Sequence, residues 1–359
     1  MKLALCAYLH GNGGAERQIT MLANAMVERG HEVHFLVLSE FNKKYEISPL
    51  VHIHDLTRDE KKALHPIIGR YKALKRAYKE IKPDCTIHYN LQSAYLTAAM
   101  PKNIYCKSIY SERGDPYDKE YDGLLGIVRN WCIKRTDGFM FQSEGARDFF
   151  GAEIAKRSVV IHNSVSVSVE KYPMPESRDN RIVSVGRLHE QKNIPLLIDA
   201  FAEIAEEFPE CTLENYGDGQ LREILQQKID KLGMAGRIRL LPARKDLFSA
   251  IRTARLFVLS SDYEGMPNAL MEAMALGLPC VATDCRPGGA RTLIEDGING
   301  YVVPRMNVNA LADKMRYVLL HPDMANTISY GGRKIANTHT EKKTFDKWEA
   351  FIMKVVKRY

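Results

Sequence analysis

The sequence predicts an α/β protein made of two doubly wound domains that face each other across a cleft. At 359 residues the chain is too long for one ordinary core and suits two domains. Short apolar runs alternate with longer helical patterns, which is typical of parallel sheets with helical crossovers. The alternation restarts after 168–180, a proline- and charge-rich segment without periodicity. We therefore expect domains at 1–170 and 171–340, followed by a C-terminal segment at 341–359.

Both halves show the strand and helix order of a doubly wound sheet. In the first half, strands are expected at 2–9, 31–38, 51–56, 83–90, 107–113, 138–143 and 158–165. The helices between them are expected at 15–30, 70–82, 91–100 and 124–134. In the second half, strands are expected at 181–188, 211–219, 237–243, 255–261, 279–285 and 300–304, with helices at 194–208 and 220–233. Ligands of such sheets bind beyond the carboxyl ends of the strands, so the loops found there should line the cleft.

The last segment, 341–359, places its apolar residues on one helical stripe. That stripe consists of Phe345, Trp348, Phe351, Ile352 and Val355. We expect an amphipathic helix that packs back on the first domain. Membrane binding by this helix is the alternative.

Composition narrows the class of protein. A net charge of +7 suits an anionic ligand or an anionic surface. The seven cysteines form no CxxC pair and no metal-like spacing with histidine, which favours reduced core cysteines in a cytosolic protein. No apolar stretch approaches the roughly 20 residues of a membrane span, and the start lacks signal-peptide features. We therefore expect a cytoplasmic protein whose only membrane contact is peripheral. A nucleic-acid-binding motif is absent from the sequence.

The basic segment 60–82 supports two interpretations. Its apolar residues recur at helical spacing and are Ile67, Ile68, Tyr71, Leu74, Tyr78 and Ile81. The first interpretation is a packed helix with a solvated basic face. The second is a surface attracted to an anionic membrane or to a polyprenyl-diphosphate acceptor.

Two cations follow a predicted strand in GRLHEQKN, residues 186–193. Arg187 offers a bidentate fork and Lys192 a point charge, while Gly186 permits a tight turn. Such a pair suits a diphosphate. The alternative is that both are solvated loop charges without a ligand. In NYGDGQ, residues 215–220, Asp218 is either a helix cap or a ligand contact.

Glycines also separate the first strand from the first helix, in HGNGGAER, residues 10–17. Gly13 and Gly14 would let backbone amides approach a phosphate or a sugar at the helix N-terminus. The alternative is a tight turn without a ligand. The spacing differs from the GxGxxG fingerprint of dinucleotide-binding folds.

Two glutamates stand eight positions apart in EGMPNALMEAMALG, residues 264–277. Pro267 suits the first helical position, so Asn268 and Ala269 would present backbone donors at a helix N-terminus. Glu272 falls one turn further along that helix, and Glu264 on the loop should face the same space. Both carboxylates can accept hydrogen bonds from a polyol. A paired-carboxylate hydrolase is disfavoured because nothing nearby activates water or donates a proton.

The whole segment SSDYEGMPNALMEAMALGLPCVATDC, residues 260–285, resembles the signature of the retaining glycosyltransferases of family 4, which have the GT-B fold. The E-x7-E pair, GRLHEQKN, YGDGQLR and GGAER all match in the family's order, so the resemblance covers essentially the whole chain. GGAER together with SERGDPY, residues 111–117, further resembles bacterial enzymes that build capsule, O-antigen or lipid-linked oligosaccharide chains. The resemblance implies a Rossmann-like acceptor-binding domain followed by a Rossmann-like nucleotide-sugar-binding domain.

The resemblance also implies a role for individual residues. Arg187 and Lys192 would neutralise the donor diphosphate, Glu264 would bind the donor sugar, and Glu272 would hold the ribose. Arg187, Lys192 and Glu264 would thus be the catalytic residues. The full donor-binding set that the resemblance implies is Gly13, Gly14, Gly186, Arg187, Lys192, Gly217, Arg244 in the base-reading loop, Glu264, Gly265, Met266, Pro267, Asn268, Ala269 and Glu272.

On the acceptor side the sequence departs from the family. Many relatives carry a histidine where this chain has Arg113, next to Glu112. Arg113 would instead contact the donor or the acceptor, and His88 or Asn90 would line the cleft. A mechanism that depends on the family's histidine cannot simply be transferred to this chain.

The implied reaction is the retaining, metal-independent transfer of a hexosyl or N-acetylhexosaminyl group. The donor would be a nucleotide diphosphate sugar, with UDP favoured over GDP, and the acceptor a glycan or a polyprenyl-diphosphate-linked saccharide. Fixed cations and helix-end amides would stabilise the leaving diphosphate, and no cofactor is expected. The rivals are a sugar-nucleotide epimerase of the same fold, which EGMPNALMEAM disfavours, and a non-enzymatic basic binding protein.

Overall fold

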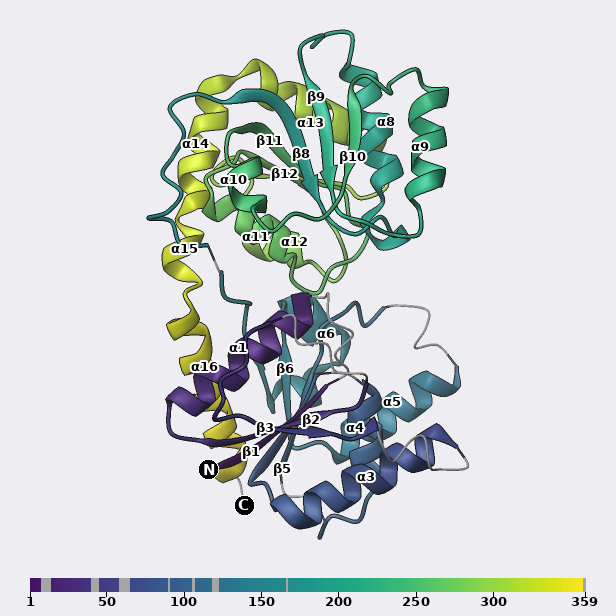
Figure 1. Ribbon diagram of the computed structural model, residues 1–359, viewed down its shortest axis with the longest axis vertical. Coiled ribbons are helices and arrows are strands. Elements are labelled where there is room, and N and C mark those ends of the chain that lie inside the picture. Colours follow the sequence, from purple (N-terminus) through teal and green to yellow (C-terminus); the bar gives the residue numbers. More distant parts are fainter. Residues whose placement is uncertain are drawn as a thin grey trace. The chain divides into compact units, whose positions relative to one another are not determined.

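The protein is described here by a computed structural model. The described residues are 1–7, 14–39, 45–57, 65–89, 91–104, 107–117, 123–165 and 167–357. Contacts divide the chain into two compact units (Figure 1). The first unit contains Met1–Ser164 and Glu341–Tyr359, and the second contains Val165–Thr340. Within the described ranges, no helix has the length and the apolar character needed to cross a bilayer.

The first unit is built on a seven-stranded sheet with the order β3-β2-β1-β4-β5-β6-β7, and its recorded pairings are all parallel. The strands are β1 (Lys2–Ala7), β2 (Glu32–Val37), β3 (His52–Asp55), β4 (Cys85–His88), β5 (Lys107–Ser111), β6 (Gly138–Phe141) and β7 (Ser158–Val160). The helices are α1 (Gly14–Glu28), α3 (Pro66–Ile81), α4 (Leu91–Ala98), α5 (Leu124–Arg135), α6 (Glu144–Phe149), α7 (Ala152–Ala155) and α16 (Glu341–Lys357).

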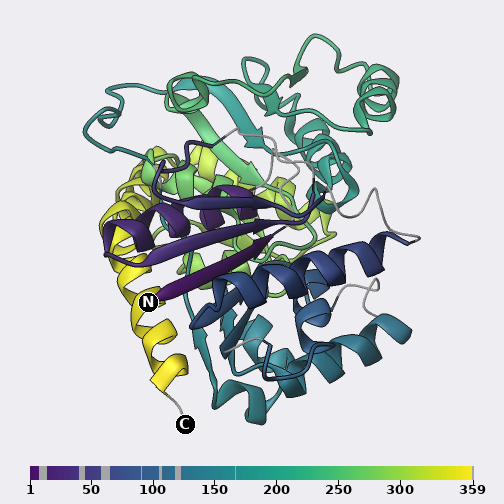
Figure 2. The same cartoon turned by 60° about the horizontal axis from the view of Figure 1, so that its bottom comes forward.

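Helices cover both faces of this sheet (Figures 1 and 2). On one face, α1 and α16 pack against Leu3 and Leu5 of β1. On the other face, Ala4 and Cys6 of the same strand pack against α3. A central parallel strand is buried on both sides, which is why β1 reads as an unbroken apolar run rather than as an alternating one.

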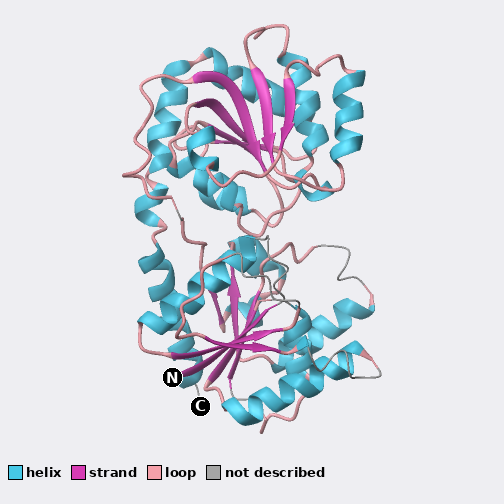
Figure 3. Cartoon of the chain, in the orientation of Figure 1, coloured by secondary structure: helices cyan, strands magenta, loops and turns pink. Residues whose placement is uncertain are grey.

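The second unit repeats this plan with a six-stranded parallel sheet of order β10-β9-β8-β11-β12-β13 (Figure 3). Its strands are β8 (Asp179–Val185), β9 (Thr212–Tyr216), β10 (Ile238–Leu241), β11 (Ala254–Leu259), β12 (Cys280–Thr283) and β13 (Tyr301–Val303). Its helices are α8 (Ile194–Ile204), α9 (Arg222–Lys231), α10 (Leu247–Ile251), α11 (Asn268–Ala275), α12 (Gly289–Leu293), α13 (Val308–Leu320), α14 (Pro322–Arg333) and α15 (Ile335–Thr338). Two parallel-sheet, Rossmann-like α/β domains are therefore present, as the sequence predicts.

The segment at 168–180 is part of the second unit, and its last residues open β8. Arg333 on α14 donates hydrogen bonds to the carbonyl oxygens of Val169 and Tyr172, at 2.9 and 2.8 Å. These bonds hold a segment without regular structure against the body of the unit.

The C-terminal helix α16 returns to the first unit. The five apolar residues of its stripe all lie in the core that contains Leu3 and Leu5. A Cβ atom on Gly138, at the start of β6, would stand 2.7 Å from the Cγ2 atom of Val355, so glycine at this position lets the helix approach the sheet. Because the stripe is buried in this core, it is not available to bind a membrane.

We expect Trp348→Ala to lower the free energy of unfolding by about 3–5 kcal/mol, because Trp348 is 2% exposed and its removal leaves a large cavity. The matched control is Met353→Ala on the exposed side of the same helix, which should change the free energy by less than about 0.5 kcal/mol. Urea denaturation followed by circular dichroism measures both. Equal stabilities of the two variants would contradict this account of α16.

Candidate functional site

Two glycine-rich loops of the second unit pack backbone against backbone beyond the ends of β8 and β9. A Cβ atom on Gly217 would lie 2.1 Å from the carbonyl oxygen of Gly186, and one on Gly219 would lie 2.3 Å from that of Leu188. The Leu188 amide donates to the carbonyl oxygen of Asp218 at 3.0 Å. These glycines therefore allow a close approach between two loops, a role that the sequence pattern alone did not distinguish from ligand binding.

An ion pair between Lys192 and Glu264 lies at the centre of the site. The Lys192 ammonium group donates to Oε1 of Glu264, and the Ser261 hydroxyl donates to the same oxygen at 2.9 Å. The Gln191 amide approaches Oε2 at 3.4 Å. The side chains of Lys192 and Glu264 are only 16% and 10% exposed, so solvent and salt screen this pair weakly. A Cβ atom on Gly186 would crowd the Lys192 stem at 3.1 Å.

The loop that carries Glu264 is held on two sides. On the first side, the Asp262 amide donates to the carbonyl oxygen of Gln191 at 2.9 Å, and the Asn193 side chain donates to the Asp262 carboxylate at 3.0 Å. On the second side, the Glu264 amide donates to the carbonyl oxygen of Arg286 at 2.7 Å. The loop after β11 is thereby fixed between the loops after β8 and β12, the strands on either side of it.

The sequence predicted Pro267 as the first residue of helix α11, and this is wrong by one residue, because the helix begins at Asn268. Pro267 is the capping residue, with extended backbone angles, and its carbonyl oxygen accepts from the Met271 amide at 3.1 Å. Asn268 and Ala269 lie in the first turn, whose amides have no acceptor within a helix. Glu272 follows one turn later and is buried.

The neighbouring glycines complete this arrangement. A Cβ atom on Gly289 would lie 2.7 Å from the carbonyl oxygen of Gly265, so the start of α12 packs closely on the loop before α11. Gly265 and Met266 are both buried. Their backbone therefore forms part of a packed turn rather than a freely moving loop.

The cations of the site differ in their surroundings. Arg187 is exposed, and the structure records no hydrogen bond or ion pair of its side chain with the residues that it describes. Arg244 is also exposed, and its guanidinium binds both carboxylate oxygens of Asp246, at 2.9 and 2.7 Å. Arg187 is thus the cation best placed to accept an anionic ligand without first losing a partner.

The interpretation of Asp218 as a helix cap is wrong. Helix α9 begins at Arg222, and the residue at its cap is Leu221. The Asp218 carboxylate instead accepts from Nε of Arg222 at 2.7 Å. An i,i+4 ion pair satisfies the carboxylate that the sequence suggested would cap the helix.

Glu112 and Arg113, which the sequence predicts on the acceptor side, lie directly after β5 in the first unit. Glu112 is buried, and its carboxylate accepts from the Tyr110 hydroxyl at 2.8 Å and from the Gly114 amide at 3.0 Å. Burial raises the pKa of Glu112 above its usual range. Arg113 donates to the Asn163 side chain at 3.0 Å, and burial lowers its pKa. The two charged groups are therefore held by different partners.

His88 ends β4, the strand next to β5. Its Nδ1 atom lies 3.1 Å from the Ser93 hydroxyl, and its Nε2 atom is buried with no hydrogen-bond partner among the residues that the structure describes. Burial lowers the pKa of His88 to about 3, so the imidazole is neutral at pH 7. Gly14 opens α1, whereas Gly13 and Asn90 lie outside the described residues.

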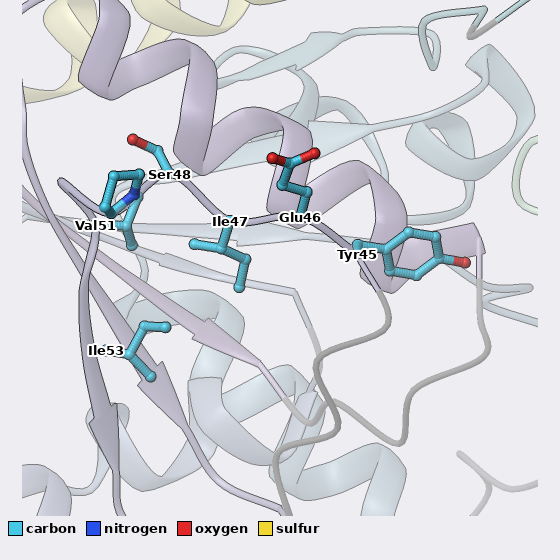
Figure 4. A pocket seen from close by; sticks show the side chains of 7 residues that line it. Tyr45, Glu46, Ile47, Ser48, Val51 and Ile53 are labelled. Atoms are coloured by element: carbon cyan, nitrogen blue, oxygen red, sulfur yellow. The ribbon is translucent and has the colours of Figure 1, made fainter.

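A separate pocket of about 640 Å³ opens on the first unit (Figure 4). One continuous stretch lines it, with side chains from Tyr45, Glu46, Ile47, Ser48, Pro49, Val51 and Ile53. Asn24 of α1 holds this stretch through bonds to the Glu46 carbonyl oxygen and the Ser48 amide, at 3.0 and 2.9 Å. The pocket contains none of the predicted site residues.

No group of three or more histidine, cysteine, aspartate or glutamate side chains suited to a metal ion occurs in the part of the chain that the structure describes. The groups that contact the Glu264 carboxylate are the Lys192 ammonium group, the Ser261 hydroxyl and the Gln191 side-chain amide. Metal independence stays a prediction.

Two stretches of the chain match known family profiles. Residues 12–169 match the profile described as Glycosyltransferase Family 4, and residues 170–335 match that described as Glycosyl transferases group 1. The two matches together span both units.

Individual relatives cover nearly the whole chain. An α-1,4-N-acetyl-D-galactosaminyltransferase of Campylobacter jejuni, whose full name specifies a diNAcBac-PP-undecaprenol-linked acceptor, is 27% identical over 89% of this chain and 89% of its own. The lipopolysaccharide core biosynthesis glycosyltransferase LpsE of Rhizobium meliloti is 27% identical over 90% of each chain. The crystal structure of Anabaena HepE in complex with UDP-glucose is similar with a TM-score of 0.81, at 19% identity over 99% of this chain and 100% of that chain. This last likeness establishes the fold.

We expect Gly217→Ala to destabilise the protein by about 1–3 kcal/mol, since its methyl group cannot fit beside the carbonyl oxygen of Gly186 without moving one loop. The control Gly236→Ala meets nothing within 4 Å and should be neutral or slightly stabilising. Thermal unfolding compares the two. Matching melting temperatures would show that the loops do not depend on this contact.

We expect His88 to make the protein less stable in acid. Its folded-state pKa of about 3 lies below the ordinary value of 6.5, so the unfolded chain binds the extra proton as the pH falls through 6.5. The stability lost should approach about 1.4 kcal/mol for each pH unit below that point. His88→Asn should give a flatter dependence of the unfolding free energy on pH between 7 and 4. If the unfolding free energy of His88→Asn depends on pH as steeply as that of the unmodified protein, protonation of His88 is not the cause of the loss of stability in acid.

Proposed function

The chain belongs to the family 4 glycosyltransferases of GT-B fold and is related to enzymes of lipopolysaccharide and polysaccharide synthesis, and we propose that it is a retaining, metal-independent transferase of hexosyl or N-acetylhexosaminyl groups. The donor is a UDP-sugar held by the second unit. The acceptor is a glycan or a polyprenyl-diphosphate-linked saccharide. The proposal draws support from the Campylobacter relative, whose name specifies a PP-undecaprenol-linked acceptor, and from HepE, which was crystallised with UDP-glucose.

The observation that carries the proposal is the ion pair of Lys192 with Glu264, which stands just before the start of α11, with Arg187 on the same loop as Lys192. A nucleoside diphosphate develops negative charge as the glycosidic bond breaks. Fixed cations and first-turn amides stabilise that charge without having to rearrange during the reaction. Arg187 supplies an exposed guanidinium and Lys192 a partly buried ammonium group, so the site offers both contacts to a diphosphate.

Glu264 binds the donor sugar in this proposal and does not act as a proton carrier. Its Oε1 atom already accepts from Lys192 and Ser261, whereas the one contact recorded for Oε2 with the described residues is that with Gln191 at 3.4 Å. Oε2 therefore retains the greater capacity to accept a sugar hydroxyl. Glu272 binds the ribose, and Arg244 lies in the loop that contacts the base.

Arg113 supplies the acceptor-side cation. The Glu112 carboxylate already accepts hydrogen bonds from Tyr110 and Gly114. We therefore assign the direct contact with the acceptor to Arg113 rather than to Glu112. Arg113 has a neutral partner, Asn163, and lies 4.6 Å over the Tyr89 ring. A part-buried guanidinium whose recorded hydrogen-bond partner among the described residues is neutral is a favourable place for a phosphate group of the acceptor.

We expect Arg187→Ala, Lys192→Ala and Glu272→Ala each to lower kcat/KM for sugar transfer by at least about 100-fold, the scale of losing one group that stabilises the transition state. Lys231→Ala removes an exposed lysine on α9 and serves as the control with unchanged activity. Transfer assays use a panel of nucleotide sugars with lipid-diphosphate acceptors, and circular dichroism confirms folding. Near-normal activity of folded Glu272→Ala would show that the donor site is wrongly assigned.

The same assay tests metal independence. The transfer rate should be unchanged after the enzyme is treated with EDTA, since cations of the protein perform the charge stabilisation. A rate that falls with EDTA and recovers with Mg²⁺ or Mn²⁺ would overturn this part of the proposal.

A further inference from the structure

Helix α5 has apolar residues on both of its sides. Cys132 and Ile133 are buried against the first unit. Leu124, Ile127 and Trp131 are spaced so that they share the opposite face, and they are 75, 66 and 44% exposed. Side chains of this size rarely stand together on a free surface, and such a face marks a site of interaction.

Helix α3 shows a similar arrangement at its start. Ile67 and Ile68 in its first turn are 46 and 48% exposed, whereas Leu74, Tyr78 and Ile81 are buried in the core. The stripe predicted over 60–82 is therefore divided, with its later part packed and its first turn exposed. Residues 60–64 lie outside the described ranges.

Basic side chains accompany both exposed apolar groups. The outward side of α3 carries Lys72, Lys75, Arg76 and Lys79, and α5 ends with Lys134 and Arg135. Glu80 is the one carboxylate in the sequences of these two helices. The Arg135 guanidinium lies 5.4 Å from the Trp131 ring, which extends the positive charge along the apolar face of α5.

Both helices belong to one layer of the first unit. The register pairs Cys6 with His88 and His88 with Tyr110, so these side chains share one face of the sheet. Cys6 packs in the core cluster of α3, and Tyr110 packs in the cluster of α4 and α5. Helix α4 contacts both α3 and α5. As crossover helices of a parallel sheet, α3 and α5 both begin at the carboxyl-end edge of the strands, which brings Ile67, Ile68 and Leu124 to the same edge. Ile127 and Trp131 continue the apolar face along α5, away from that edge.

We propose that the outward faces of α3 and α5 dock the protein on an anionic phospholipid membrane. Apolar side chains at the interface beside a rim of lysine and arginine are the features by which peripheral helices bind such a surface. A symmetric contact with a second copy would oppose this positive rim to itself, so charge complementarity favours an anionic partner. The sequence analysis did not predict the exposed apolar face of α5. On α3 it predicted the basic apolar stripe, but not that only the first turn of the stripe is exposed.

Docking goes beyond the proposed reaction and can be measured without it. It would place the carboxyl-end edge of the first sheet close to the lipid headgroups. That edge carries His88, Glu112 and Arg113. Only this consequence, access to a lipid-linked acceptor, rests on the proposed function.

Tryptophan fluorescence provides a direct test, because the chain has only two tryptophans. Trp348 is buried in the core, so Trp131 alone should respond to a bilayer. We expect vesicles of equal parts phosphatidylglycerol and phosphatidylcholine to shift the emission to shorter wavelength, and high salt to reverse the shift. Trp131→Phe should abolish it. Absence of a shift, or an equal shift with pure phosphatidylcholine, would overturn the proposal.

Matched substitutions test the face itself by vesicle flotation. Ile127→Asp should weaken binding by at least about tenfold, the scale of losing one buried isoleucine. Ile224→Asp on α9 in the second unit alters an isoleucine that is 61% exposed, against 66% for Ile127, and should bind normally. Lys72→Glu together with Lys79→Glu should weaken binding further at low salt. Equal flotation of Ile127→Asp and the unmodified protein would contradict docking through α5.

Two controls separate the other outcomes. Self-association in gel filtration that Ile127→Asp abolishes, with no vesicle binding, would show that a second copy covers this face and would overturn the proposal. Transfer to a water-soluble acceptor should be the same in Ile127→Asp and the unmodified protein. Failure of the proposed reaction would leave the vesicle results unchanged, so the two proposals can fail separately.

Discussion

The ion pair between Lys192 and Glu264 is the interaction on which the rest of the second unit's site depends. It joins loops that follow β8 and β11, which are neighbours in the sheet, and the glycine at 186 makes room for the lysine stem. Removing one partner would leave the other charge poorly solvated, which costs more than a surface pair of the same type. The pair also places a carboxylate directly before a helix N-terminus. A donor diphosphate would therefore meet the Lys192 ammonium group and first-turn amides whose positions are already set.

Parallel topology explains why both units have their polar groups at the carboxyl ends of strands. The units use this edge differently. In the second unit, glycines allow loops to pack against each other, and the charged groups remain within reach of a ligand. In the first unit, Glu112 and His88 are buried, and hydrogen bonds within the unit engage both carboxylate oxygens of Glu112 and the Nδ1 atom of His88. The difference between the charged loops of the second unit and the more closed strand ends of the first unit follows from these local environments.

The sequence predicted the alternating strands and helices well, because buried parallel strands leave strong local patterns. The structure brings Lys192 and Glu264 of the predicted site into contact, and the roles of the site residues stay a prediction. The sequence could not reveal partners that are distant along the chain. Lys192 and Gln191 contact the Glu264 carboxylate from 72 and 73 positions away along the chain, so no local pattern encodes these contacts. The glycine at 217 was expected to admit a ligand, but its nearest constraint is another loop. The exposed face of α5 was missed because periodicity identifies one apolar stripe, and a helix that is apolar on both sides has almost none.

The central claim is that Lys192 and Glu264 act as one unit in donor binding, and a double-substitution cycle tests it most directly. Calorimetry would measure the affinity of UDP-sugar for the unmodified enzyme, Lys192→Met, Glu264→Gln and the doubly substituted enzyme. The account predicts that the two single losses do not add, with a coupling free energy above about 1 kcal/mol. Losses that add within about 0.3–0.5 kcal/mol would contradict it, because they would show that the two side chains bind the donor independently.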